Sequence, residues 1–184
     1  MTSKVKKQIL KLKESSTLVI NERSKELISQ GKKVFQFGFG QSPFPVPEKI
    51  VEKLKENAHR KEYLPIQGLP QLREKISKYL LRRTGNDYPK ENILITPGSK
   101  EAMLLIHIAF NGEIIIPAPG WVSYEPQAEI GSNKVHWLET SRVNNWFPTG
   151  KELEKKIKLI GKNKNLILIL NSPNNPSGSV CNNL

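Results

Sequence analysis

Short apolar runs alternate with helical patterns through the second half of this chain, and this alternation constrains the fold more than any other feature. The runs are rich in β-forming residues and apolar on both faces, and they cover residues 93–96, 113–116, 135–138 and 166–170. The residues between them have the apolar periodicity of helices, over 99–110, 123–130 and 151–160. This pattern is typical of a mostly parallel sheet that is covered by helices. We therefore predict an α/β fold.

The first half of the chain is predicted to be mainly helical. Its helices are expected over residues 18–30, from Pro47 onward and over residues 69–83. One more short strand, at residues 34–37, leads into a turn rich in glycine and proline over residues 38–47. Within residues 1–13, apolar side chains alternate with lysines in the pattern of an amphipathic helix. We expect that helix to pack on the protein itself.

The composition excludes several classes of protein. With 37% hydrophobic and 25% charged residues, the chain fits a soluble globular protein. It contains no run that approaches the length of a membrane span, and basic residues interrupt every apolar stretch near the amino terminus, unlike a secretory signal. Cys181 is the single cysteine, which rules out an internal disulfide and suits a reducing compartment. We therefore expect a cytoplasmic protein that makes no use of a membrane.

The net charge of +12 raises the question of nucleic-acid binding. The basic residues, however, are spread along the predicted helices, are mixed with glutamates and lack interleaved aromatic residues. This distribution favours a solvated, lysine-rich surface, so we predict no nucleic-acid partner. The three histidines are scattered without the spacing of metal ligands, so we predict no metal site.

Residues suited to ligand binding follow two of the predicted strands, at the edge where ligands bind in parallel sheets. Gly98, Ser99 and Lys100 open a helix after residues 93–96, so their amides and the helix dipole suit a phosphate, although a simple helix cap uses the same residue types. Trp121 lies in a loop rich in proline and glycine after residues 113–116. It either offers a flat ring to an aromatic ligand or packs under its own loop.

The third such segment, after residues 166–170, is Asn171-Ser-Pro-Asn-Asn-Pro-Ser-Gly178. Its prolines stiffen the loop and its asparagines offer uncharged hydrogen-bond donors, but taken singly this composition is also that of an ordinary turn. Together, the three strand ends supply a phosphate cradle, an aromatic face and an amide donor. A flat, phosphorylated heteroaromatic ring needs all three.

With these motifs in this order, the chain resembles the class I/II aminotransferases of fold type I, which use pyridoxal 5′-phosphate. The resemblance covers residues 18–180, and Asn-x-Pro-x-Asn-Pro-[Ser/Thr]-Gly is among the more specific motifs of that family. It implies that Asn175 bonds the phenolic oxygen of the cofactor and that Trp121, with Tyr124 nearby, stacks on the pyridine ring. It also implies that the backbone of Ser99 and Lys100, after Gly98, holds the phosphate.

The resemblance extends to the substrate and to a second subunit. It implies that the backbone of Gly40 faces the substrate carboxylate and that Trp121 and Asn175 also bind the substrate. It further implies that Tyr63 reaches the phosphate in a neighbouring subunit. A homodimer with shared active sites is therefore expected. In domain terms, residues 1–48 correspond to an amino-terminal arm and part of the small domain. Residues 49–184 correspond to an incomplete cofactor-binding large domain.

The family's Schiff-base lysine, and the Asp that pairs with the pyridine nitrogen, fall after Leu184 in the family's order, so we assign no catalytic residue. The implied reaction is transfer of an amino group from an amino acid to a 2-oxo acid. We expect this chain, taken alone, to be truncated and inactive. Two alternatives stay open: a non-catalytic binding or dimerisation fragment of the same fold, and another fold type I enzyme such as a β-lyase.

Overall fold

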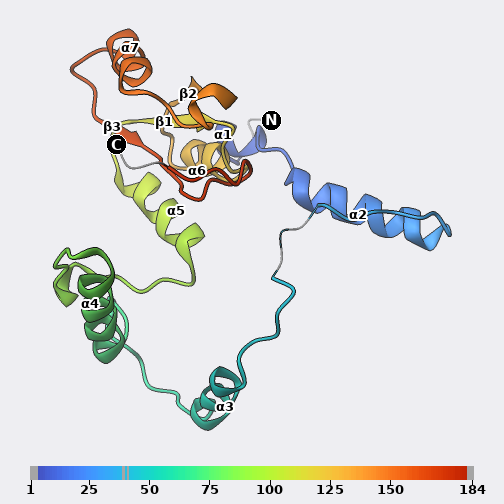
Figure 1. Ribbon diagram of the computed structural model, residues 1–184, viewed down its shortest axis with the longest axis vertical. Coiled ribbons are helices and arrows are strands. Elements are labelled where there is room, and N and C mark those ends of the chain that lie inside the picture. The colour runs from blue at the N-terminus through green and yellow to red at the C-terminus, as the bar shows by residue number, and fades with distance from the viewer. Residues whose placement is uncertain (1–3, 39, 41, 182–184) are drawn as a thin grey trace. The chain divides into compact units, whose positions relative to one another are not determined.

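The computed structural model describes residues 4–38, 40 and 42–181 (Figure 1). They form two compact units: the sheet unit, with the described residues of 1–16 and 99–184, and the helical unit, residues 17–98. The predicted domain boundary after residue 48 stays a prediction. Residues 1–3 of the predicted first helix, and Phe39 and Gln41 of the predicted turn, lie outside the described residues.

A three-stranded parallel sheet lies at the centre of the sheet unit, which confirms the predicted α/β class. Its strands are β1 (Glu113–Ala118), β2 (Val135–Glu139) and β3 (Leu166–Leu168), in the order β2-β1-β3. In register, Ile114 is opposite Val135 on one side and Ile167 on the other. The middle strand is apolar on both faces because both faces are covered, and Ile114, Ile115 and Ile116 are at most 1% exposed.

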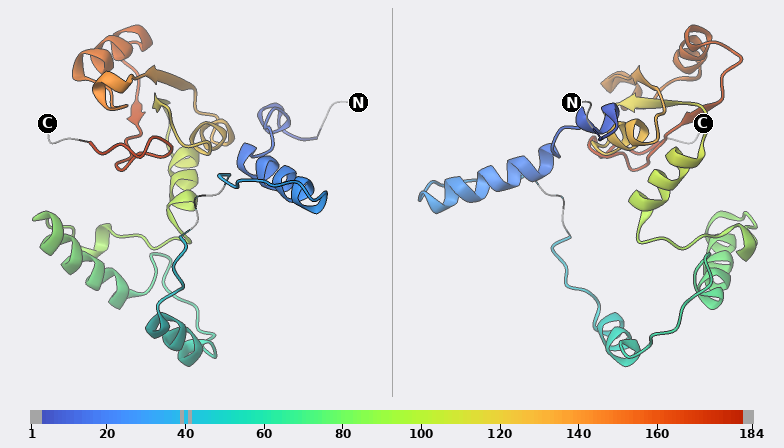
Figure 2. Two further views of the ribbon diagram at one scale, coloured as in Figure 1. Left: turned by 45° about the vertical axis from the view of Figure 1, so that its right-hand side comes forward. Right: turned by 180° about the vertical axis from the view of Figure 1, so that it is seen from behind.

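Helices cover this sheet on both sides (Figures 1 and 2). The helices are α5 (Ser99–Ala109), α6 (Tyr124–Ile130) and α7 (Gly150–Ile160), with the single turn η2 (Arg142–Asn144) before α7. Helix α6 contacts α5, β1 and β2, and α7 contacts β2. Among the described residues, one buried cluster consists of Ile114, Ile116, Tyr124 and Ala128, so β1 and α6 supply all four of its side chains.

The amino-terminal helix is much shorter than the sequence pattern indicated. Helix α1 spans only Lys7–Leu10, and the prediction of a helix throughout residues 1–13 is wrong for the described residues. Its apolar side chains stay partly exposed, Leu10 at 59%, so little burial offsets the cost of ordering a short helix. Helix α1 does pack on the protein itself, because Gln8 Nε2 donates a hydrogen bond to Ser132 Oγ at 3.0 Å and α1 contacts α6.

The helical unit contains the helices that were predicted for the first half of the chain. They are α2 (Ser16–Ser29), α3 (Glu48–Asn57) and α4 (Pro70–Thr84), followed by the turn η1 (Lys90–Asn92). Helix α4 begins with a proline in its first turn and ends at Gly85, whose φ of 75° suits glycine. Arg73 of α4 is buried, and its Nε donates to the Lys90 carbonyl at 3.0 Å.

Two predicted strands are not strands among the described residues. Residues 34–37 pair with no strand, and Phe37 is 93% exposed. Residues 93–96 form no strand, and Ile95 donates its amide to the Gln67 carbonyl at 3.0 Å instead of joining a sheet. The same isoleucine leaves no room for a side chain at Gly68, where a Cβ would lie 2.5 Å from the Cβ of Ile95. Among the described residues, no helix is long and apolar enough to cross a membrane.

Candidate functional site

The candidate site of the sheet unit begins where β1 and β3 end, because hydrogen bonds join the loops that follow these strands. Asn174 Nδ2 donates to the Pro119 carbonyl at 3.1 Å and to Ser177 Oγ at 2.8 Å. The backbone amide of Asn175 donates to Asn171 Oδ1 at 2.9 Å. The loop over residues 171–178 is therefore held in shape by its own side chains and attached to the loop after β1.

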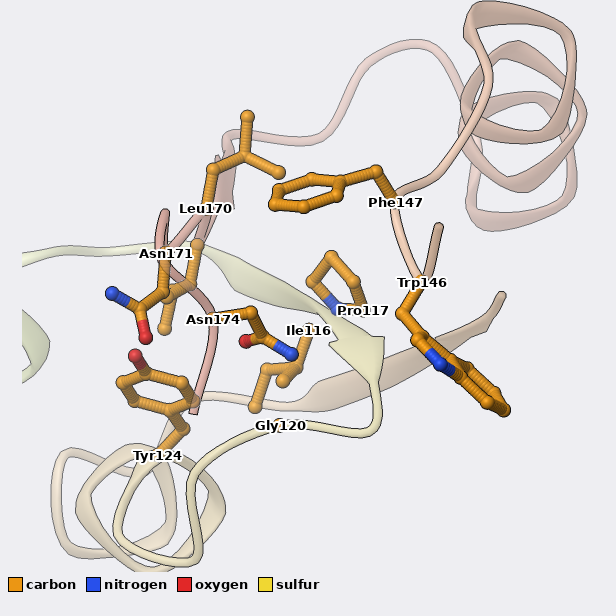
Figure 3. A pocket seen from close by; sticks show the side chains of 10 residues that line it. Ile116, Pro117, Gly120, Tyr124, Trp146, Phe147, Leu170, Asn171 and Asn174 are labelled. Carbon is orange, nitrogen blue, oxygen red and sulfur yellow. The ribbon is translucent and has the colours of Figure 1, made fainter. Parts of the chain in front are cut away.

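A shallow pocket lies at this edge of the sheet (Figure 3). Its empty space is about 270 Å³ including open solvent, so little of it is an enclosed cavity. It is lined by Ile116, Pro117, Gly120, Tyr124, Trp146, Phe147, Ile169, Leu170, Asn171 and Asn174. In Figure 3 the Asn174 amide lies at the centre, Tyr124 points toward the loop that carries Asn171, and the ring of Trp146 turns away. The pocket is thus apolar at its base, with amide groups on one wall.

Trp121 lies just before α6 and contacts residues from two helices. Its ring meets that of Tyr124 edge to face, with centroids 5.6 Å apart and planes at 84°. The Lys100 Nζ atom lies over the Trp121 ring, 5.5 Å from its centroid, which is a favourable cation–π geometry. Burial raises the pKa of the Tyr124 phenol, so that group stays neutral. Trp121 also packs against the buried core, and its role in stacking on a ligand stays a prediction.

The amino-terminal turn of α5 lies next to Trp121, because this turn carries Lys100. Gly98 has φ of 90° and no atom within 4 Å of the place where a Cβ would be, and α5 begins at the next residue, Ser99. Both residues and Lys100 are exposed. Gln127 of α6 donates from Nε2 to the Lys100 carbonyl at 2.7 Å. The predicted phosphate-binding turn and the predicted stacking ring therefore lie together.

The remaining predicted residues are less constrained. Asn175 is exposed, and among the described residues its side-chain amide makes no hydrogen bond, so it is available to a ligand. Gly40 and Tyr63 belong to the helical unit, and both are exposed. Their assignments rest on the resemblance and stay predictions.

Sequence reasoning missed Gln127 and Asn174. Gln127 lies on the face of α6 that also carries Tyr124 and Ala128, and a polar residue on an otherwise apolar helical face is a signal that was available. Asn174 lies inside the predicted motif, but the motif alone does not say which asparagine bonds the neighbouring loop.

The fold is that of an α/β protein whose candidate ligand site lies at the carboxyl ends of parallel strands. The family model for aminotransferase class I and II matches residues 32–183. The chain therefore belongs to the class I and II aminotransferase family.

The chain is also similar to individual aminotransferases in sequence and in structure. The aspartate aminotransferase of Thermotoga maritima is 33% identical over 181 residues, which cover 96% of this chain and 47% of that protein. The asparagine–oxo-acid transaminase of Streptococcus mutans is 31% identical, over 97% of this chain and 46% of that protein. The crystal structure of the aspartate aminotransferase from Rhizobium meliloti matches 98% of this chain and 46% of its own, with a TM-score of 0.88 and 26% identity. The chain spans about half the length of these relatives.

Proposed function

We propose that this chain supplies the cofactor-binding strand ends of an aminotransferase that transfers an amino group from an amino acid to a 2-oxo acid. The observation that carries the proposal is that the first turn of α5 lies beside the ring of Trp121, through the 5.5 Å contact of Lys100. Family membership supports the reaction class, because class I and II aminotransferases use pyridoxal 5′-phosphate.

The residues present fit the chemistry of that cofactor. A helix leaves its first amides without intrahelical partners, so the start of α5 and the positive end of its dipole suit a phosphate. At Gly98 the position that a Cβ would take is open space. The Lys100 ammonium adds positive charge at the same place. Trp121 offers an aromatic face, and Asn175 offers an uncharged donor.

We assign the roles accordingly. The amides of Ser99 and Lys100, after Gly98, bind the phosphate, Trp121 orients the pyridine ring by stacking, and Asn175 donates to the phenolic oxygen. When bound, pyridoxal 5′-phosphate supplies the carbonyl carbon that carries the amino group and the electron sink for proton transfer. The chain's own residues bind and orient, and none of the described residues is assigned a proton-transfer step.

The substrate and subunit assignments extend this proposal. The backbone of Gly40 faces the substrate carboxylate, and Trp121 and Asn175 also contact the substrate. Tyr63, which is fully exposed, contacts the phosphate bound to a second copy of the chain, so the protein acts as a homodimer. We place the reaction in the cytoplasm, in keeping with the single cysteine.

Calorimetric titration of the full chain with pyridoxamine 5′-phosphate tests the proposal. This form of the cofactor has no aldehyde, so it does not react with the many surface lysines. We expect saturable binding at one site per chain. Trp121→Leu should weaken it roughly two- to tenfold, because a stacked aromatic pair contributes about 0.5–1.5 kcal/mol beyond its buried area. The control Trp137→Leu, which removes the bond from the Trp137 indole of β2 to Glu125 of α6, should leave the affinity unchanged.

Two results would contradict the proposal. The first is the absence of saturable binding by the unmodified chain. The second is equal affinity in the Trp121→Leu and Trp137→Leu variants.

A further inference from the structure

Gln127 is a polar residue where the packing of α6 calls for an apolar one. It is only 6% exposed and lies on the helical face that carries Tyr124 and Ala128. Helix α6 uses this face to contact α5 and β1. A buried glutamine therefore occupies a position in the interface between two helices.

The side chain of Gln127 makes one hydrogen bond and lacks another. Its Nε2 donates to the Lys100 carbonyl at 2.7 Å, whereas its buried Oε1 has no partner among the described residues. A buried acceptor without a partner destabilises the folded state, and an apolar side chain of similar size avoids that cost. Packing alone therefore does not explain why a glutamine occupies this position. Its hydrogen bond to the Lys100 carbonyl is the feature that a functional role would use.

That bond joins the two parts of the proposed cofactor site. Lys100 is the second residue of α5, in the turn whose amides face the phosphate. Trp121, whose ring is to stack on the pyridine, stands just before α6, which carries Gln127. The distance from the amides of Ser99 and Lys100 to the ring of Trp121 therefore depends on the contact between the first turn of α5 and α6. The hydrogen bond of Gln127 is part of that contact.

We propose that Gln127 is a positioning residue for the cofactor: it fastens the first turn of α5 to α6 and so holds the phosphate amides in register with the ring of Trp121. The inference rests on the proposed function. Apolar contacts hold the two helices together in any case, since Met103 of α5 packs on the core that includes Ala128. Loss of the Gln127 bond therefore frees the turn without separating the helices.

The test compares two ligands that differ only in the phosphate, pyridoxamine 5′-phosphate and pyridoxamine. Gln127→Met keeps the length of the side chain and removes its amide. We expect this variant to bind pyridoxamine 5′-phosphate about fivefold more weakly, the loss for one hydrogen bond of typical strength, and to bind pyridoxamine as the unmodified chain does. Its urea midpoint should be unchanged or higher, because the unpaired acceptor is gone.

A matched control removes an equivalent amide elsewhere in the same unit. Gln8→Met deletes the bond from Gln8 Nε2 to Ser132 Oγ, and neither ligand should be affected. Hydrogen exchange gives a readout that needs no ligand. The amides in the second turn of α5, which bond the carbonyls of the first turn, should exchange faster in Gln127→Met and not in Gln8→Met.

Each outcome decides the question. If Gln127→Met binds pyridoxamine 5′-phosphate as tightly as the unmodified chain, the positioning role is refuted while the proposed function stands. Equal weakening of both ligands also refutes it, because it shows a general effect on the fold. If the unmodified chain does not bind pyridoxamine 5′-phosphate, the proposed function fails and the positioning role fails with it.

Discussion

Truncation of Ile114 to alanine should cost this chain much of its stability, because Ile114 lies at the centre of the sheet unit. It is fully buried in β1, between Val135 of β2 and Ile167 of β3, and belongs to the core cluster with Tyr124. The change removes three carbon atoms from a place with neighbours on every side. Neither flanking strand can move in without breaking its hydrogen bonds to β1.

The expected magnitude follows from this burial. At about 0.8 kcal/mol for each buried carbon group, the lost transfer free energy is roughly 2.4 kcal/mol. The cavity left between the strands adds to this, so we expect a loss of about 3 kcal/mol in the free energy of unfolding, within the range of roughly 2–5 kcal/mol for such truncations. Ile114→Val should cost about 0.5–1.5 kcal/mol. Urea unfolding followed by far-ultraviolet circular dichroism measures both, with the slope checked for constancy.

The control for this prediction is Val143→Ala. It also truncates a β-branched residue of the sheet unit, but Val143 is 93% exposed in η2, so the change should stay within about 0.5 kcal/mol. The reasoning would be refuted if Ile114→Ala cost no more than Val143→Ala. In that case β1 would not be the central strand of a packed core.

Two further predictions concern a helix cap and a charge cluster. Thr149→Ala removes the hydroxyl that accepts a hydrogen bond from the Glu152 amide at the start of α7, and it should lower the free energy of unfolding by about 1 kcal/mol in the same urea assay; an unchanged midpoint would argue against the cap. Hydrogen bonds from His136 and Lys164 lower the pKa of Glu113, so the unfolded chain binds the proton more readily. This stabilisation is present above the ordinary carboxyl pKa of about 4.3 and is lost as the pH falls through the lowered pKa. The decline in unfolding free energy below about pH 4 should be shallower in Glu113→Gln, and parallel pH profiles would contradict this role.

The sequence by itself predicted three segments of the second half that form the sheet. The runs around Ile114, Val135 and Ile167 are apolar on both faces and alternate with helices, and all three became parallel strands. That information is local, because periodicity is written into consecutive residues. It also identified the family, since the spacing within residues 171–178 is itself a local pattern.

Tertiary structure decided the cases where a segment needs a distant partner. Two segments, residues 34–37 and 93–96, have the composition of strands. A strand forms, however, only where another strand offers a free edge in register. The composition of a segment does not indicate whether such an edge is present. The amino-terminal amphipathic pattern likewise gives a long helix only where a surface covers its apolar side, and α1 stays short because its side chains remain largely exposed.

The site divides in the same way. The sequence supplied Trp121, the turn at Ser99 and Lys100 and the asparagine loop as separate elements. Which atoms meet depends on the order β2-β1-β3 and on the packing of α6 against α5, both of which bring together residues that are far apart in the chain. The Lys100 ammonium over Trp121 and the bond from Gln127 to Lys100 exist only because those two helices pack together.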